Sequence, residues 1–128
     1  MPHFGARSKT ALATCDPRLV EIATLTIKRF DFSVLEGYRP LEMQKIAYES
    51  GASSVKEGKH NVLPSLAFDL APYPIDWHNV PRFCILAGYI FEASYEVGVT
   101  LRWGGFWTYP FDPGHFEITD LPGPGPRR

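Results

Sequence analysis

The segment that decides the fold runs from Lys59 to Pro72 and reads Lys-His-Asn-Val-Leu-Pro-Ser-Leu-Ala-Phe-Asp-Leu-Ala-Pro. Its run Leu66-Ala67-Phe68 is apolar and typical of a short buried strand. Asp69 follows at once, and burying a carboxylate costs free energy unless a partner neutralises it. A metal ion is one such partner, and a nearby histidine such as His60 is the usual co-ligand for zinc. We therefore expect the chain to hold this pair against a third group near the C-terminus.

The composition is that of an ordinary globular domain. The chain has 128 residues, of which 45% are hydrophobic and 21% are charged, so one domain with a sizeable core is expected. A net charge of -1 supplies no general attraction to nucleic acid or to an anionic membrane. No apolar run is long enough to cross a bilayer, and the N-terminus lacks the apolar core of a secretory signal. We expect a single catalytic domain over 1–120 and a disordered Pro/Gly tail over 121–128.

Helices and strands alternate along the chain, but the strands are few and short. Asp16 followed by Pro17 is typical of a helix start, and Gly98 is a suitable end for the longest predicted helix. Helices are expected near 9–14 and over 17–30, 41–50 and 80–97, and strands over 32–35, 66–68, 99–103 and 116–118. The helix over 80–97 is apolar on almost every side, which predicts a course through the middle of the domain. This order predicts an α+β fold, in which a small, mainly antiparallel sheet packs against helices on one face.

The two cysteines, Cys15 and Cys84, match no metal-binding spacing. Both lie in apolar helical settings, which favours two buried free thiols. The sequence leaves a disulfide between them open.

Two of the histidines, His60 and His115, each lie beside an acidic residue at the edge of a predicted strand. Zinc hydrolases commonly use three ligands from His, Asp or Glu and leave the fourth position to water, and His60, Asp69 and His115 complete such a set. Asp112 lies three residues before His115, where it can serve as a general base toward that water. Simpler interpretations stay open: His60 as a hydrogen-bonded core histidine, Asp69 as a turn cap, and Asp112 as a turn former.

Arg39 lies between a predicted strand and a predicted helix start. A guanidinium there can bind a carboxylate through two parallel hydrogen bonds. The alternative is an ion pair with Glu36 or Glu42 at the surface. The aromatic segment 103–111 also has two interpretations, because it can line a groove beside the metal or cover the end of the core.

Four motifs in order resemble one family of enzymes. They are Glu36-Gly37-Tyr38-Arg39-Pro40 with Gln44, Lys59-His60 through Ala67-Phe68-Asp69, Arg102-Trp103-Gly104-Gly105, and Asp112-x-x-His115-Phe116-Glu117. Together they resemble the zinc peptidases of bacterial cell walls. These include the VanY- and VanX-type D-alanyl-D-alanine peptidases and the phage endolysins that cut the L-alanyl-D-glutamate bond. The short length and the segment 71–77, Ala-Pro-Tyr-Pro-Ile-Asp-Trp, look most like the phage endolysins.

The resemblance implies a hedgehog or D-Ala-D-Ala peptidase-like fold with Zn²⁺ held by His60, Asp69 and His115. It implies that Asp112 activates water and passes its proton to the leaving amine. It implies that Arg39 binds substrate or steadies the developing oxyanion. The implied function is hydrolysis of the peptide stems of peptidoglycan, as a phage endolysin of the L-alanyl-D-glutamate endopeptidase type.

Several positions differ from what is common in that family. Gly58 stands where many relatives have serine, and Phe106 stands where phage relatives often have aspartate. Asp112 stands where many have glutamate, and the spacing from His60 to Asp69 is longer than usual. These differences bear on fine substrate preference more than on the metal site.

Three alternative functions stay open: a D-alanyl-D-alanine carboxypeptidase, a non-catalytic zinc-binding module of the same fold, and a metal-dependent nuclease. The pair His60-Asn61 suggests the nuclease, but the near-neutral charge and the lack of a basic stripe disfavour it. We expect a monomer that acts on peptidoglycan without inserting into a membrane or binding nucleic acid. Without a visible signal peptide, it should stay in the host cytoplasm until lysis and then act on the cell wall in the periplasm.

Overall fold

A four-stranded sheet lies at the centre of the computed structural model, which describes residues 2–51, 58–108 and 110–120. Its strands are β1 (Phe32–Glu36), β2 (Ala67–Pro72), β3 (Thr100–Trp103) and β4 (His115–Thr119). They lie in the order β1-β2-β4-β3, and every neighbouring pair is antiparallel. The predicted α+β class with a small antiparallel sheet is therefore confirmed.

The register between β2 and β4 brings distant parts of the chain together. Asp69 lies opposite His115, and Phe68 lies opposite Phe116. Successive side chains of a strand point to opposite faces, so Phe68 and Phe116 enter the core while Asp69 and His115 share the other face. One face of these two strands thus supports the core, and the other face carries polar groups.

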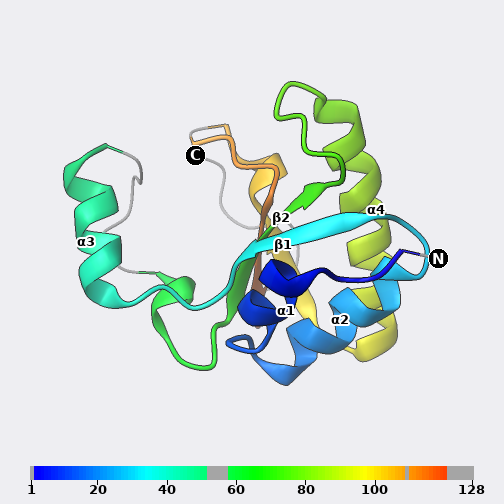
Figure 1. Cartoon of the computed structure of the whole chain (residues 1–128), viewed down its shortest axis with the longest axis horizontal. Helices are drawn as coiled ribbons and strands as arrows, with labels where there is room; N and C mark the ends of the chain where they lie inside the picture. Colours follow the sequence, from blue (N-terminus) through cyan, green and yellow to red (C-terminus); the bar gives the residue numbers. More distant parts are fainter. Residues whose placement is uncertain (1, 52–57, 109, 121–128) are drawn as a thin grey trace.

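Helices α2 (Pro17–Ile27) and α4 (Val80–Val97) pack together on the core side of the sheet (Figure 1). The side chain of Asp16 accepts a hydrogen bond from the backbone N–H of Arg18 at 2.9 Å, which caps α2 as predicted. Gly98 ends α4 with a φ of 83°, a left-handed conformation that glycine adopts without strain. The core that these elements enclose includes Leu19, Ile22, Val34, Phe68, Leu70, Leu86, Ile90 and Phe116.

Helix α4 does not run through the middle of the domain, so that prediction was wrong. Its residues Ile85 and Tyr95 are exposed, because the sheet and α2 cover only one side of the helix. Cys84 lies on this exposed side as well, whereas Cys15 is buried, and both thiols are free. The prediction of two buried thiols therefore holds for Cys15 and was wrong for Cys84.

Helix α1 (Ala6–Leu12) covers the outer edge of β1. The backbone N–H of Val34 donates to the hydroxyl of Ser8 at 2.9 Å. This N–H faces the open edge of the sheet, and Ser8 supplies the acceptor that a neighbouring strand would otherwise provide. The rings of Phe4 and Phe32 meet edge to face, with their centroids 5.3 Å apart. The short helix predicted near residue 9 thus begins at Ala6, and its backbone is held firmly on the sheet.

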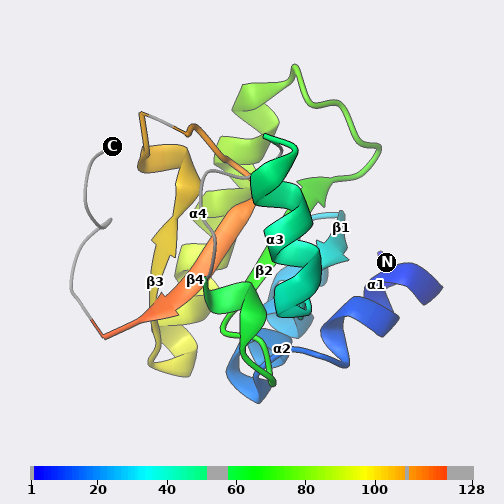
Figure 2. The same ribbon diagram turned by 90° about the vertical axis from the view of Figure 1, so that its left-hand side faces the viewer.

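Helix α3 (Leu41–Glu49) lies apart from the other helices (Figures 1 and 2). Only Gln44 of this helix is buried, while the apolar side chains of Met43 and Ile46 are 55% and 60% exposed. The prediction of a helix here is confirmed, but its apolar residues do not enter the core. The loop predicted over 51–58 falls largely outside the described residues, and so does the tail predicted over 121–128.

Two glycines allow backbone segments to approach closely near the start of β4. A Cβ at Gly104 would lie 2.1 Å from the carbonyl oxygen of Asp112, and a Cβ at Gly114 would lie 2.5 Å from that of Leu70. The backbone N–H of Asp112 also donates to the carbonyl of Gly104 at 3.0 Å. Gly104 therefore fixes where the segment that carries Asp112 lies.

We predict that Gly104→Ala destabilises the fold by about 1–3 kcal/mol, because the added methyl group would force the backbone at Asp112 to move. The free energy of unfolding in urea measures this change. Gly88→Ala is the matched control, since Gly88 is an exposed residue of α4 and a Cβ there meets nothing within 4 Å. The control should gain about 0.4–1 kcal/mol. Unchanged stability of Gly104→Ala would contradict the close approach.

Candidate metal centre

The structure brings together the three residues that the sequence predicts as metal ligands. His60 comes from the short 3₁₀ helix η1 (Lys59–Asn61), Asp69 from β2 and His115 from β4. One possible ligand atom from each lies within 4.8 Å of the others. Nε2 of His60 is 3.2 Å, and Nδ1 of His115 is 3.1 Å, from Oδ1 of Asp69. Both imidazoles are buried, at 7% and 8% exposure.

The outer nitrogen of each imidazole has an acceptor as its partner. Nδ1 of His60 lies 2.7 Å from the carbonyl oxygen of Gly37, and Nε2 of His115 lies 2.9 Å from Oε1 of Glu117. A carbonyl or carboxylate oxygen only accepts, so these outer nitrogens carry the hydrogens and donate them. The inner nitrogens of the neutral rings then present lone pairs toward Asp69. Histidines that bind metals are usually oriented in this way.

Two imidazole lone pairs and a carboxylate oxygen that meet in a buried place repel one another unless a cation lies among them. Protons or a metal ion can supply that positive charge. Two nitrogens and one oxygen from three separate elements form a ligand set of the kind found in metal hydrolases. We conclude that His60, Asp69 and His115 can hold a metal ion.

Electrostatics within the group follow from its burial. Burial alone would raise the pKa of Asp69, but hydrogen bonds from His115 and His60 outweigh it and hold that pKa well below its ordinary value. Burial alone would lower the pKa of His115, but hydrogen bonds to Asp69 and Glu117 outweigh it and raise that pKa to about 10. The group therefore binds positive charge strongly, whether as a proton or as a metal ion.

Asp112, the predicted general base, lies beside this group. It borders a cavity of about 280 Å³ that Asp69, Glu36 and Trp77 also line. The backbone N–H of His115 donates to the carbonyl of Asp112 at 3.2 Å, so a tight turn joins the two residues. Burial, and next the negative charge of Asp69, raise the pKa of Asp112 from its ordinary value.

Arg39 has partners within the chain. Its guanidinium donates to the carboxylate of Glu36 and, at 2.5 Å, to Oε1 of Gln44. The ion pair with Glu36 that the sequence offered as an alternative is therefore present. The pKa of Arg39 is raised first by Glu36 and also by the negative charges of Asp69 and Asp112, which places the guanidinium within electrostatic reach of the group. The one buried residue of α3 thus orients an arginine beside the metal ligands.

The aromatic segment 103–111 covers the end of the core through Trp103, whereas a groove lined by this segment stays a prediction. Trp103 packs against Phe106 and Phe116 at centroid distances of 5.0 and 6.2 Å and covers the end of the core. The ring of Trp107 instead lies 5.3 Å from that of His115, beside the metal ligands. Tyr109 lies outside the described residues.

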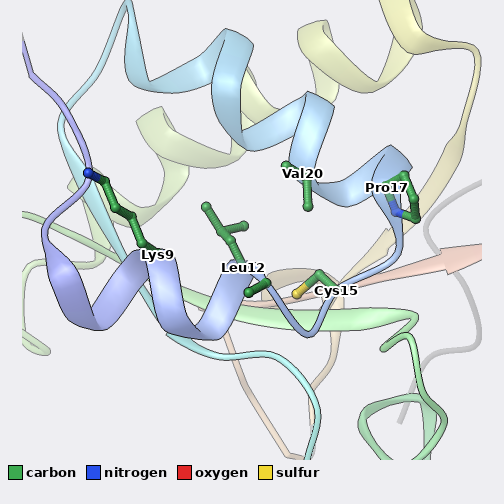
Figure 3. Close-up of a pocket in the computed structure, with 6 residues that line it drawn as sticks. Lys9, Leu12, Cys15, Pro17 and Val20 are labelled. Atoms are coloured by element: carbon green, nitrogen blue, oxygen red, sulfur yellow. The ribbon is translucent and has the colours of Figure 1, made fainter.

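A second, larger cavity of about 460 Å³ lies between α1 and α2 (Figure 3). It is lined mainly by apolar side chains, among them Leu12, Pro17 and Val20, with Lys9 and Cys15. Burial raises the pKa of Cys15 to about 11, so its thiol stays protonated near neutral pH. This cavity brings no acidic or histidine side chains together and carries no catalytic group.

Comparison with known proteins identifies the family. The phage L-alanyl-D-glutamate peptidase family matches residues 1–118. The chain belongs to this family. It is 29% identical over 132 aligned positions to the L-alanyl-D-glutamate peptidase of Escherichia phage T5, covering 90% of this chain and 96% of that protein. It also resembles the crystal structure of the Serratia marcescens L-Ala D-Glu endopeptidase ChiX, with a TM-score of 0.80 and 28% identity, covering 92% and 91% of the two chains.

The family confirms the predicted function: this protein is an L-alanyl-D-glutamate peptidase of the phage endolysin type, acting on peptidoglycan. The matches give no support to the alternative of a D-alanyl-D-alanine carboxypeptidase. Among the described residues, no helix is long and apolar enough to cross a membrane.

Glu117 of the peptidase lies directly behind His115, a role that was not predicted from the sequence. Its Oε2 lies 3.8 Å from Nζ of Lys59 and 3.9 Å from Nη1 of Arg102. Burial opposes the charged form of Glu117, but the hydrogen bond from His115 and the nearby cations lower its pKa. His115 and Glu117 are two residues apart on one strand, so their side chains lie on the same face of the sheet. This spacing could have predicted the contact from the sequence. The carbonyl of Gly37 left no signal, because any residue has one.

We predict that Glu117→Ala weakens metal binding by the peptidase about 10–100-fold, since His115 loses the acceptor that fixes its tautomer. Competition with a chromophoric chelator measures the dissociation constant. Glu117→Gln is the matched variant: its amide oxygen can still accept the hydrogen bond, so its loss should be smaller. Equal losses in the two variants would show that the charge of Glu117, and not its acceptor oxygen, matters.

We also predict that metal binding releases a proton from His115. The pKa of His115 is about 10 in the folded chain, above the ordinary value of 6.5. In protein from which a chelator has removed the metal, protonation of His115 therefore stabilises the fold, and this contribution is complete below pH 6.5. This contribution is lost as the pH rises toward the folded value. A metal ion must displace that proton, so the apparent affinity of the protein for the metal should rise about tenfold per pH unit between pH 6.5 and the folded pKa of about 10.

Calorimetric titration with Zn²⁺ in buffers of different ionisation enthalpy counts the protons released. His78→Ala should behave like the wild type, because His78 is exposed and lies outside the group. An affinity that does not change with pH would refute the competition.

Proposed function

We propose that the peptidase uses Zn²⁺, held by His60, Asp69 and His115, to hydrolyse the L-alanyl-D-glutamate bond of peptidoglycan stems. The observation that carries this proposal is the meeting of two imidazole nitrogens and a carboxylate oxygen, with the outer nitrogens engaged by Gly37 and Glu117. Nitrogen ligands favour zinc over calcium or magnesium, which prefer oxygen. When bound, zinc supplies Lewis acidity, which acidifies a water molecule and polarises a carbonyl group.

Asp112 acts in this proposal as general base and then as general acid. Its carboxylate takes a proton from the attacking water and passes it to the amine of the leaving D-glutamate residue. A pKa raised by burial and by Asp69 suits this task, because the group must both accept and release a proton near neutral pH. The same residue argues against a non-catalytic zinc-binding module, which needs no such carboxylate.

Arg39 acts as the electrostatic partner of the reacting carbonyl. Its two terminal nitrogens each donate one hydrogen bond, Nη1 to Gln44 and Nη2 to Glu36. The remaining N–H groups can donate to the oxyanion that develops during attack. A guanidinium that is oriented beforehand costs little rearrangement when the oxyanion forms.

All the proposed ligands and catalytic groups come from one chain, so we propose a monomer with one catalytic domain over 1–120. As a member of a phage peptidase family, the protein would remain in the host cytoplasm until lysis and then reach the wall. The membership supports this route, and separation of infected cells into fractions before and during lysis tests it.

Mass spectrometry of purified peptidoglycan after digestion tests the reaction itself. The wild type with zinc should release fragments with a new N-terminal D-glutamate. We predict that Asp112→Asn lowers kcat about 10²–10⁴-fold, the usual contribution of a general acid–base group, while zinc content stays that of the wild type.

His60→Ala is the contrasting variant, because it should lose both zinc and activity. Elemental analysis after dialysis separates the two outcomes. Normal turnover by Asp112→Asn would remove Asp112 from its role, and unchanged zinc content in His60→Ala would reject His60 as a ligand.

A further inference from the structure

The substrate brings a negative charge into a cavity that carboxylates line. Glutamate has two carboxyl groups, and only one of them continues the peptide stem. The other therefore remains on the residue that supplies the leaving amine, directly beside the scissile bond. The carboxylates of Glu36, Asp69 and Asp112 line the cavity next to the metal ligands. Arg39 pairs with Glu36 and a bound metal ion would balance Asp69, so Asp112 and the carboxylate of the substrate remain to repel each other. A site that accepts D-glutamate needs a cation to balance them.

Arg7 is the basic residue that lines this cavity of about 280 Å³. It comes from α1, a segment far in sequence from the metal ligands, and faces the same space as Trp77 and Asp112. Figure 1 shows how this arises, because α1 lies along β1, which in turn neighbours the strand of Asp69. Arg7 thus places positive charge at the edge of the active site.

Arg7 differs from the other arginines of the described chain. Each of the others has a partner: Asp16 for Arg18, Glu92 for Arg29, Glu36 and Gln44 for Arg39, the carbonyls of Tyr73 and Pro74 for Arg82, and Glu117 for Arg102. The side chain of Arg7 is exposed and has no hydrogen bond or ion pair with any described residue. Its planar fork is therefore available for a carboxylate from outside the chain.

The backbone around Arg7 is well anchored. The neighbouring Ser8 is buried and bonded to the N–H of Val34, and Phe4 packs edge to face on Phe32. Because these contacts hold α1 against β1, the base of the arginine side chain stays at the cavity. A partner held in position loses less entropy when it binds a ligand.

From this geometry we infer that Arg7 binds the free carboxylate of the D-glutamate residue and selects acidic stems over stems in which that carboxylate is amidated. The inference rests on the proposed function and adds to it the group that recognises the substrate. Arg39 serves the reacting carbonyl in this scheme, because Glu36 and Gln44 already engage it.

Two synthetic stem peptides test the inference, one with D-glutamate after L-alanine and one with the amidated residue. The wild type should cleave the acidic peptide with the larger kcat/KM. In Arg7→Gln the ratio of the two kcat/KM values should fall about 10–100-fold, since hydrogen bonds between charged groups contribute about 1.5–3 kcal/mol. The loss should appear mainly in KM. Arg7→Lys keeps the charge without the fork and should recover part of the ratio.

Lys9→Gln is the matched control, because Lys9 is an exposed cation of the same helix but lines the other cavity. Its ratio should equal that of the wild type. An unchanged ratio in Arg7→Gln, or an equal fall in Lys9→Gln, overturns the inference.

A binding measurement separates this inference from the proposed function. In Asp112→Asn protein, the dissociation constant of the acidic peptide should rise about 10–100-fold when Arg7 is also replaced by Gln, while that of the amidated peptide changes little. Equal dissociation constants with and without Arg7 would reject the role of Arg7, whatever the turnover. Failure of the wild type to cut either peptide would instead reject the proposed function.

Discussion

The antiparallel pairing of β2 with β4 is the constraint on which the active site depends. It sets Asp69 opposite His115 on the face of the sheet that points away from the core. It also sets Phe68 opposite Phe116 on the face that packs against the core. A slip by one residue would exchange the two faces and bury the polar groups in the core. The hydrophobic core therefore specifies the metal site, because the register that fills one face also arranges the other.

Around this pairing, the ligands are oriented by groups that do not touch the metal. The carbonyl of Gly37 sets the tautomer of His60, and Glu117 sets that of His115. Glu117 in turn lies near two cations, Lys59 and Arg102, which favour its charged form. The buried carboxylate of Glu117 thus has partners of opposite sign, as the low polarity of a protein interior demands.

Local signals in the sequence predicted much of the fold and the metal group. The capping of α2 by Asp16 and the end of α4 at Gly98 depend on a few neighbouring residues, so they were visible in the sequence. His60, Asp69 and His115 stood out because histidine and aspartate are unusual beside short apolar strands. Asp112 stood out as a carboxylate three residues before His115, and the family motifs then supported its predicted role.

What the sequence did not predict depends on contacts between distant segments. The sequence indicated helix α3 but not that its apolar side chains Met43 and Ile46 are exposed. The partners of Arg39 and the position of Arg7 follow from how α1, α3 and β1 lie around the site. Sequence spacing carries no information on such arrangements.

The isolation of α3 has a consequence for the position of Arg39. A helix with one buried side chain adds little to global stability, so it belongs to the parts of a protein that open at low cost. An opening of α3 would separate Gln44 from Arg39, while the sheet and its three ligands would keep their places. We therefore expect the positions of the three ligands to depend on the sheet alone, whereas the position of Arg39 also depends on how firmly this marginal helix holds Gln44 in place.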